Sequence, residues 1–526
     1  MADTLTTGPA PQDAAGVKTR RRRRILWSSA AFLALIVCFL LVEHVRGKIA
    51  YRRHVKELTR NGEQLSIAAM EPKRPSPDQN AAPLLSPLTN AIETSAATWQ
   101  NPPPALRFPE PGKALVTWRL KEWSRDGKRT NNWERVGAQL LQARDILTAI
   151  HSAAAQPAFD GGVDYQKGFV DFRTGPVLAI KRAAQTLFVA ADYELNRDHF
   201  DDAYADVLDL VKLTASQKSE PLVISQLVRL AGVAMAFQAT WKLLQAPGGT
   251  PAQFAALQQA WEKADFAADM AAAFEMERAM TLDYFEQILA SNSKLRFVVS
   301  NQEAYEEPFN WFVTSGFLLH WVNVPLWRIA WAQQDQLHAL QRWQKLIERD
   351  RLARTNSWAA VSSQLIQSRL VEMSLSTDSI PDQDRPSSWE RFRFLFSAGP
   401  LGVSDQTIRS SLTAEAQQQM AITAIALRRF QMQTGKLPGA LNALVPEYLQ
   451  KLPRDPMDGG VLHYRPSSEL QFVLYSVGTD AKDDGGDSAL NSETKHYRQI
   501  WDGRDAVWPN PATPTNSVQA MQWTKD

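Results

Sequence analysis

One long apolar run interrupts an otherwise mixed pattern near the start of the chain, at residues 25–42. The run holds eighteen residues with neither a charge nor a proline. As a helix rising 1.5 Å per residue it would cover about 27 Å, close to the roughly 30 Å hydrocarbon core of a bilayer. Trp27 lies near one end, where an indole ring favours the membrane interface. The pattern predicts one transmembrane helix.

A cleaved signal peptide is the main alternative for this run. Its apolar region would hold about 7–15 residues and end in a small-x-small cleavage site. Here the run is longer and passes directly into Glu43 and Arg46 without such a site. The single cysteine, Cys38, follows Val37, where a lipoprotein signal needs a small residue. The sequence therefore predicts an uncleaved anchor.

Beyond the anchor, apolar residues recur at helical spacing from about residue 131 to 367. Residues 200–211 follow i, i+3, i+4, i+7 spacing, and residues 222–245 are apolar nearly all round, which predicts a central buried helix. Thr250 offers a capping oxygen, with Pro251 at the first position of the next helix. Because no 34-residue period is sustained, we expect an irregular array of helical hairpins.

Residues 309–332 form a second apolar stretch, with four of the seventeen tryptophans. A second transmembrane span is not expected, because His320, Asn323, Pro325 and Arg328 interrupt the stretch. Three interpretations stay open: a core helix, an interfacial segment lying on the membrane, and a partner-binding patch. Base rates favour packing in the core.

Proline marks the segment between the anchor and the helices. Residues 71–111 contain ten prolines, which predicts an extended linker with one short helix across residues 88–98. The predicted fold class is mainly α. The predicted parts are a basic cytoplasmic tail (1–24), the anchor (25–42), a juxtamembrane helix (43–70), the Pro-rich linker (71–130), the helical domain (131–400), a small C-terminal α+β module (412–490) and a C-terminal tail (491–526). This C-terminal tail either folds back on the module or stays loose.

The C-terminal module has an ordered set of motifs. A helix predicted over residues 413–434 ends at Gly435, and strands are predicted at 461–465 and 470–476. The spaced motifs are Thr434-Gly435-Lys-Leu-Pro438, Leu452-Pro453-Arg-Asp455-Pro456, Tyr464 and Phe472-Val-Leu-Tyr475-Ser476-Val-Gly478-Thr-Asp480. In this order they resemble the head domain of the type II secretion major pseudopilin, the G-type subunit.

This resemblance covers about residues 413–490 and implies a calcium-binding acidic loop after the last strands. The candidate calcium ligands are Asp480, Asp483, Asp484 and Asp487, helped by Ser476 and backbone carbonyls. Calcium takes six to eight oxygen ligands, and glycines let carbonyls turn inward, but a solvated Asp/Gly turn has the same composition. No prepilin-peptidase site precedes Ile25, so we do not expect processing as a pilin.

Charge is divided unevenly along the 526 residues. The net charge is +2, yet residues 1–60 hold twelve basic and four acidic residues, which leaves the rest net acidic. Basic residues lie on both sides of the run, and their tight packing before it favours an N-in orientation. A net acidic body makes nucleic-acid binding unexpected, and one cysteine excludes a disulfide framework. We expect a single-pass protein of a bacterial inner membrane with an extracytoplasmic body.

Signatures of enzymes are missing from the sequence. It has no phosphate-binding GxxxxGK[ST] loop, no GxGxxG, no HExxH and no GxSxG. One charged group, Glu275, Glu277, Arg278 and Glu286, is either a salt-linked helix face or a site for acid–base chemistry. The expected function is protein–protein interaction in the envelope, associated with type II secretion or pilus-like machinery. An envelope hydrolase and a solute- or peptide-binding protein are the alternatives.

Overall fold

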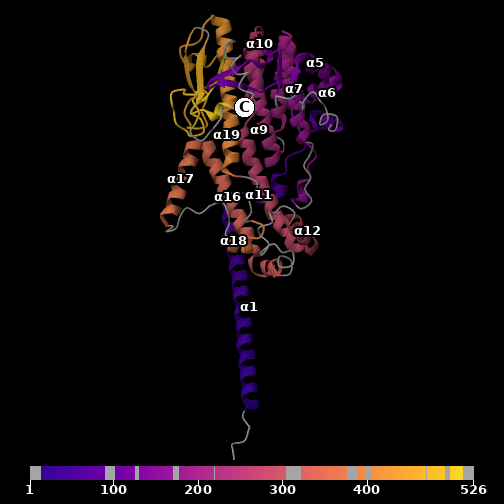
Figure 1. Ribbon diagram of the computed structural model, residues 1–526, viewed down its shortest axis with the longest axis vertical. Helices are drawn as coiled ribbons and strands as arrows, with labels where there is room; N and C mark the ends of the chain where they lie inside the picture. Colours follow the sequence, from indigo (N-terminus) through magenta and orange to yellow (C-terminus); the bar gives the residue numbers. More distant parts are fainter. Residues whose placement is uncertain are drawn as a thin grey trace, which may run out of the picture. The chain divides into compact units, whose positions relative to one another are not determined.

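The structure, a computed structural model, is mainly helical with a small sheet component (Figure 1). It describes residues 14–88, 101–124, 130–169, 177–217, 220–303, 322–375, 388–397, 404–468, 471–491 and 498–512. The chain divides into two compact units. Unit 1 takes Met1–Glu63, Phe285–Gln341 and Asp382–Pro400, and unit 2 takes Gln64–Tyr284, Arg342–Pro381 and Leu401–Asp526.

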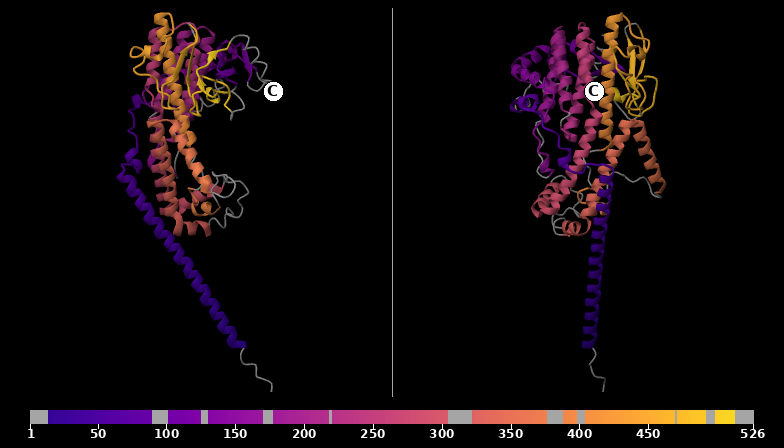
Figure 2. Two further views of the ribbon diagram at one scale, coloured as in Figure 1. Left: turned by 90° about the vertical axis from the view of Figure 1, so that its left-hand side faces the viewer. Right: turned by 180° about the vertical axis from the view of Figure 1, so that it is seen from behind.

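Unit 1 contains the predicted anchor within one 47-residue helix, α1 (Ala14–Arg60). The apolar window of α1 is 0% buried, and by length and composition the helix is a candidate membrane span (Figure 2). The predicted juxtamembrane helix continues α1 without a break to Arg60, and the short helix α2 (Ile67–Met70) follows in unit 2.

The rest of unit 1 packs around two buried tryptophans, Trp327 and Trp331. Its elements are α12 (Asn292–Glu303), α15 (Val324–Leu326), the π-helix η9 (Trp327–Trp331), the first part of α16 (Ala332–Thr355) and α18 (Ser388–Arg393). Asp335 accepts hydrogen bonds from Trp327 Nε1 and from the backbone N–H groups of Phe396 and Ser397, at 2.8–3.0 Å. Burial raises the pKa of Asp335 to about 6. These bonds tie η9 to the chain after α18.

The apolar stretch 309–332 is described from residue 322 onward, so residues 309–321 lie outside the described residues. Within the described part, Trp327, Ala330 and Trp331 are buried, as the core interpretation expects. Val322 and Ile329, by contrast, are 41% and 52% exposed. The described residues 322–332 therefore include both buried and exposed apolar side chains.

Unit 2 is a helical array around α9 (Val223–Leu244), which packs against α7 (Val177–Asn196), α8 (Phe200–Ser216) and α19 (Asp405–Thr434). This confirms the predicted central buried helix. Although α9 is long and apolar enough to span a membrane, most of its window is buried inside the protein. Further described helices of unit 2 are α5 (Trp133–Gln142), α6 (Arg144–Ala154), α10 (Pro251–Glu262), α11 (Phe266–Ala290), which ends in unit 1, and α17 (Trp358–Leu375).

The start of α10 shows how local sequence sets a helix boundary. α9 ends at Leu244, and Gly248 and Gly249, whose φ angles of 117° and 83° favour glycine, lie in the turn that leads to α10. Thr250 accepts a hydrogen bond from Gln253 N, and the Gln253 side chain accepts one from Thr250 N, completing a capping box. The predicted cap is confirmed.

The Pro-rich segment is not the extended linker that its composition predicts. It contributes α3 (Ala82–Leu85), β1 (Arg107–Glu110), β2 (Lys113–Leu115) and β3 (Glu122–Ser124), and the last pairs with β4 (Thr130–Asn132). Leu85 and Ala114 are 0% exposed. Proline forbids helix interiors but tolerates first turns and edge strands, so apolar residues between the prolines still anchor the segment. All but the first residue of the predicted short helix 88–98 lies outside the described residues.

The C-terminal part of unit 2 has the predicted order of helix, hairpin and loop. Ser404 caps α19, which begins eight residues before the predicted start, and Gly435 ends it with a φ of 77°. The hairpin pairs β5 (His463–Pro466) with β6 (Phe472–Ser476), and β7 (Ala506–Val507) extends the sheet. β8 (Asn510–Pro511) pairs in parallel with β2.

The described part of the tail folds back into unit 2. Trp508 is 4% exposed and meets Phe237 of α9 edge-on, with ring centroids 5.2 Å apart. Trp241 Nε1 donates to the carbonyl oxygen of Pro509 at 2.7 Å. Helices, Pro-rich segment and C-terminal strands therefore share one core, and the module is not a separate body.

This shared core generates a prediction. Trp508→Ala should lower the free energy of unfolding by about 3–5 kcal/mol, because it empties a buried indole site on α9. Denaturant unfolding of the detergent-solubilised chain measures the change. Leu141→Ala, at a side chain 72% exposed, is the control and should cost under about 0.5 kcal/mol. Equal losses in the two variants would contradict the packing role of the tail.

Candidate functional site

The acidic loop that follows β6 is organised around a residue outside the predicted ligand set, Asp505. Its carboxylate is 0% exposed. It accepts hydrogen bonds from the backbone N–H groups of Asp484, Gly486 and Asp487 at 3.3, 2.7 and 3.0 Å. Burial raises the pKa of Asp505, while these three bonds oppose the rise. The loop thus directs three backbone N–H groups toward the buried carboxylate of Asp505.

The four predicted calcium ligands share this loop, and three of their carboxylates are engaged within it. Asp480 accepts from Lys482 N at 3.2 Å, and Asp487 accepts from Ala489 N and pairs with Arg504 at 3.2 Å. Asp483 accepts from the Tyr475 hydroxyl and from Gly485 N, both at 2.9 Å. The Gly485 N–H holds the pKa of Asp483 below its usual range.

These aspartates are neighbours in the chain, but the structure does not gather them into a tight ligand set. Among the described residues, the acidic and histidine side chains whose ligand atoms all lie within 4.8 Å of one another are Glu194, His199 and Asp202, where α7 ends and α8 begins. That group is largely exposed, and its His199 Nδ1 is bonded to Glu194 at 2.8 Å. Calcium at the loop stays a prediction.

Ser476, the proposed helper ligand, is committed to another buried carboxylate. Its hydroxyl donates to Asp455 Oδ1 at 2.9 Å, and Asp455 also accepts from the backbone N–H groups of Met457 and Val477 at 2.9 Å. Asp455 is 0% exposed, and burial raises its pKa. The Asp-Pro motif therefore fastens its own turn to the end of β6.

The charged group in α11 is dispersed rather than convergent. Glu275 pairs with Arg351 at 2.8 Å, and Arg278 NH2 donates to the carbonyl oxygen of Gln64 at 2.9 Å. Glu277 accepts from Val223 N at the start of α9, and burial raises its pKa to about 7. Glu286 belongs to unit 1. Each group in unit 2 has a structural partner, and for Glu275 that partner is the salt link that the helix-face interpretation expects.

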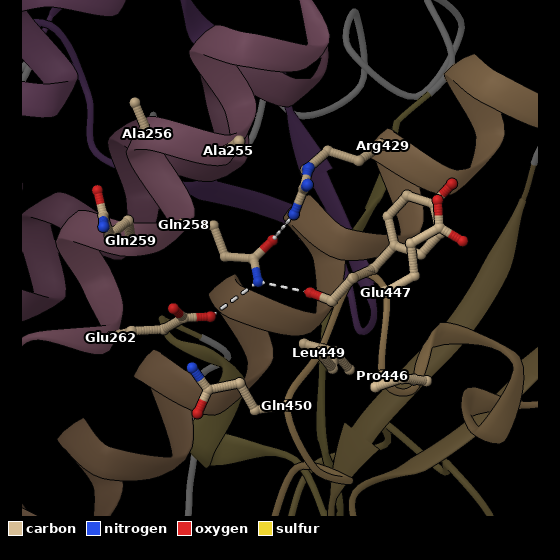
Figure 3. A pocket seen from close by; sticks show the side chains of 11 residues that line it. Ala255, Ala256, Gln258, Gln259, Glu262, Arg429, Pro446, Glu447, Leu449 and Gln450 are labelled. Carbon is tan, nitrogen blue, oxygen red and sulfur yellow. Dashed lines mark hydrogen bonds between the residues drawn. The ribbon is translucent and has the colours of Figure 1, made fainter.

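A polar hollow of about 420 Å³ lies between α10 and residues 446–450 (Figure 3). The amide of Gln258 stands at its centre: it accepts from Arg429 at 2.8 Å and donates to Glu262 and to the carbonyl oxygen of Tyr448 at 2.8 and 2.7 Å. The hollow is polar, but its central amide is already engaged with the protein.

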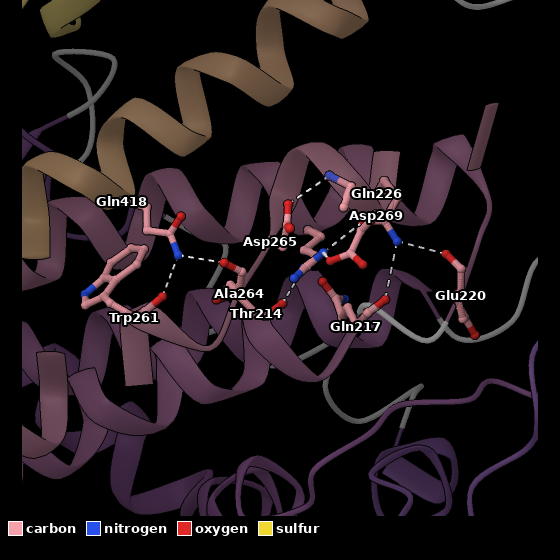
Figure 4. A network of polar contacts seen from close by, with 11 residues as sticks. Thr214, Gln217, Glu220, Gln226, Trp261, Ala264, Asp265, Asp269 and Gln418 are labelled. Carbon is pink, nitrogen blue, oxygen red and sulfur yellow. Dashed lines mark hydrogen bonds and ion pairs between the residues drawn. The ribbon is translucent and has the colours of Figure 1, made fainter. Parts of the chain in front are cut away.

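A network of polar contacts, which includes Thr214 and Asp269, links helices of unit 2 (Figure 4). Arg229, on α9, is 0% exposed and donates to the carbonyl oxygen of Thr214 at 2.7 Å and to Asp269 at 2.5 Å. Its guanidinium lies 4.6 Å from the ring centre of Phe266. Gln418 makes a similar link, donating to the carbonyl oxygen of Ala264 at 2.8 Å. These contacts hold helices together and engage their polar groups inside the protein.

His151 is clamped between two carboxylates of α8. Its Nε2 lies 3.3 Å from Asp206 and its Nδ1 lies 2.9 Å from Asp209. The hydrogen bonds to Asp206 and then Asp209 raise the pKa of His151 to about 9. Burial raises the pKa of Asp206 to about 6. The clamp ties α6 to α8 through a charged imidazolium.

Comparison of the chain with protein-family models, with curated proteins and with solved structures finds no match. The pseudopilin resemblance stays a prediction that rests on the motifs of residues 413–490. A function for this chain therefore has to be inferred from the geometry of its own side chains.

The His151 clamp predicts a pH dependence of stability. Because the folded pKa is raised above the unfolded value near 6.5, the stabilisation is fully present below pH 6.5 and is lost as pH rises through about 9. The imidazole is about a third exposed, so we expect about 1–2 kcal/mol after solvent screening. Denaturant unfolding of wild type and His151→Gln from pH 6 to 10 measures it.

The two stability curves should converge at high pH. In an Asp206→Asn, Asp209→Asn background, His151→Gln should no longer change the pH dependence, because the carboxylates that raise the pKa are gone. A constant gap between wild type and His151→Gln across this pH range would show that the clamp does not hold a charged ring.

Three backbone N–H groups, those of Asp484, Gly486 and Asp487, donate to the Asp505 carboxylate, and we call this arrangement the amide cradle. Asp505→Asn should lower the free energy of unfolding by about 1–3 kcal/mol, because an amide nitrogen would face these backbone donors. Asp480→Asn, at an exposed position of the same loop, is the control and should change it by under about 0.5 kcal/mol. If Asp505→Asn costs no more than the control, the cradle is not what orders the loop.

Repeating the melts with millimolar calcium tests the calcium prediction. Binding should raise the melting temperature of wild type and of Asp505→Asn, and Asp483→Asn should abolish the rise. An unchanged melting temperature would count against calcium at this loop.

Proposed function

We propose that this chain is a single-pass, N-in protein of a bacterial inner membrane whose extracytoplasmic part is an interaction scaffold. The observation that carries the proposal is the bare apolar part of α1. Its eighteen uncharged residues have outward-facing side chains such as Leu26, Phe32 and Leu35, each more than 60% exposed. The window around them is 0% buried, so the protein itself provides no cover. A bilayer provides that cover.

The build of unit 2 supports a scaffold role. The C-terminal hairpin and loop are fixed to helices that are distant in sequence: Trp358 Nε1 donates to the carbonyl oxygen of Thr479, and Trp358 N donates to that of Pro456, both at 3.0 Å. Inside the core, Lys242 and Asp192 pair at 2.6 Å with both side chains almost fully buried. Such a unit presents its surface features in fixed positions.

We propose the C-terminal module as the partner-binding part, acting with type II secretion or pilus-like machinery. The support is the motif resemblance together with exposed apolar side chains on this module, Val461 and Leu490, at 42% and 37% exposure. The hydrolase alternative has no convergent carboxylates to support it among the described residues of α11. The solute-binding alternative rests on the hollow of Figure 3.

Site-specific photocrosslinking in intact cells tests this role. A photoreactive amino acid at Val461 should give a crosslinked product that contains a subunit of the secretion or pilus-like apparatus, identified by mass spectrometry. The matched control is the same amino acid at Leu141, on α5, which is exposed but lies outside the module. Products that are the same at both positions, or that contain no such subunit, would contradict the proposed partner.

A further inference from the structure

The other segments of unit 1 are bonded to α1 at the first residues after the uncharged run. Glu43 follows the last residue of that run and is only 8% exposed. Gln334 Nε2 donates to both the carbonyl oxygen and the carboxylate of Glu43, at 2.8 and 3.0 Å. Arg393 of α18 lies 3.5 Å from the same carboxylate, and Arg46 lies 3.2 Å from it. A buried, paired carboxylate fixes this position along α1.

A second bond fixes η9 at the same level. His44 Nδ1 lies 2.9 Å from the carbonyl oxygen of Ile329. At 1.5 Å per residue, Glu43 and His44 lie about 3 Å beyond the end of the uncharged run. Figure 1 shows α18 beside α1 where its bare part begins. The π-helix and α18 are therefore held within about one helical turn of the hydrocarbon edge, if the run spans a bilayer as proposed above.

Unit 1 exposes large apolar side chains on η9 and α18, and on the residues that lead into η9. Ile329 is 52% exposed, Val322 is 41% exposed and Trp389 is 54% exposed. Trp389 packs edge-on against the buried Trp331, with ring centroids 5.8 Å apart. One part of the Trp389 side chain therefore contacts the core, and the other part is exposed. Ile329 lies on η9 and Trp389 packs on η9 through Trp331, and exposed large apolar side chains gathered on neighbouring elements mark an interaction surface.

The chemistry of this surface fits the boundary of a bilayer. Indole rings favour the interface between headgroups and acyl chains, and aliphatic side chains gain free energy when they bury their CH2 groups there. Arg46, next to Glu43, has a side chain that is 60% exposed and carries the charge that phosphate groups attract. Both kinds of group lie beside the point where α1 leaves the proposed membrane.

We propose that unit 1 is a membrane-seated collar, in which Val322, Ile329 and Trp389 insert into the interfacial layer of the leaflet that α1 leaves. The occupant of this surface is phospholipid of that leaflet. The inference rests on the proposed membrane anchor and extends it: the chain contacts the membrane through a folded surface as well as through the span.

Spin-label accessibility tests the collar. In a Cys38→Ser background, single cysteines replace Val322, Ile329, Leu35 in the span and Leu141 on α5, and Trp389 stays in place. The full chain is reconstituted into vesicles of phosphatidylcholine and phosphatidylglycerol. Collision rates of each label with oxygen, which concentrates in lipid, and with a water-soluble nickel complex are compared. The labels at Val322 and Ile329 should resemble the label at Leu35, and the label at Leu141 should report water.

Each other outcome overturns the proposal in a distinct way. If the labels at Val322 and Ile329 report water while the label at Leu35 reports lipid, the anchor stands and the collar is wrong. If the label at Leu35 also reports water, the proposed anchor itself fails. If neither reagent reaches Val322 and Ile329, a second copy of the chain covers this surface instead of lipid.

Discussion

The architecture depends on the eighteen uncharged residues of α1, whose side chains the protein leaves bare. Burying one leucine or phenylalanine side chain is worth about 1.5–3 kcal/mol, so a run of them left in water would be strongly unfavourable. We propose a bilayer as their surroundings. Polar structure begins at once beyond the run: Glu43 is buried and paired with Gln334 and Arg393, so the other segments of unit 1 meet α1 where the proposed hydrocarbon ends.

Unit 2 owes its cohesion to contacts between segments far apart in the chain. The pair Lys242–Asp192 is buried beside the Phe188 ring, and Lys242 also donates to the carbonyl oxygen of Pro104 at 3.1 Å. Burial lowers the pKa of Lys242 and raises that of Asp192, and each partner opposes the shift of the other. Removing one partner would leave an uncompensated buried charge, which is why such a pair fixes α7, α9 and the Pro-rich segment together.

Local signals in the sequence predicted local structure well. The all-round apolar pattern of 222–245 predicted the buried α9, and Thr250 with Pro251 predicted the start of α10, because caps and periodicity act within one turn of helix. The Pro-rich segment was predicted wrongly as a linker, since its packing depends on a strand, β8, almost 400 residues away. Asp505 was missed for the same reason: nothing near it in sequence indicates that the loop at 484–487 turns its amides toward it.

The central claim is that the apolar part of α1 stays in the mature protein and holds it in a membrane. The most direct measurement is the intact mass of the protein recovered from membranes after alkaline carbonate extraction. The predicted result is a chain in the membrane pellet whose mass still includes residues 25–42. Recovery of a shorter chain in the soluble fraction, beginning after residue 42, would contradict it.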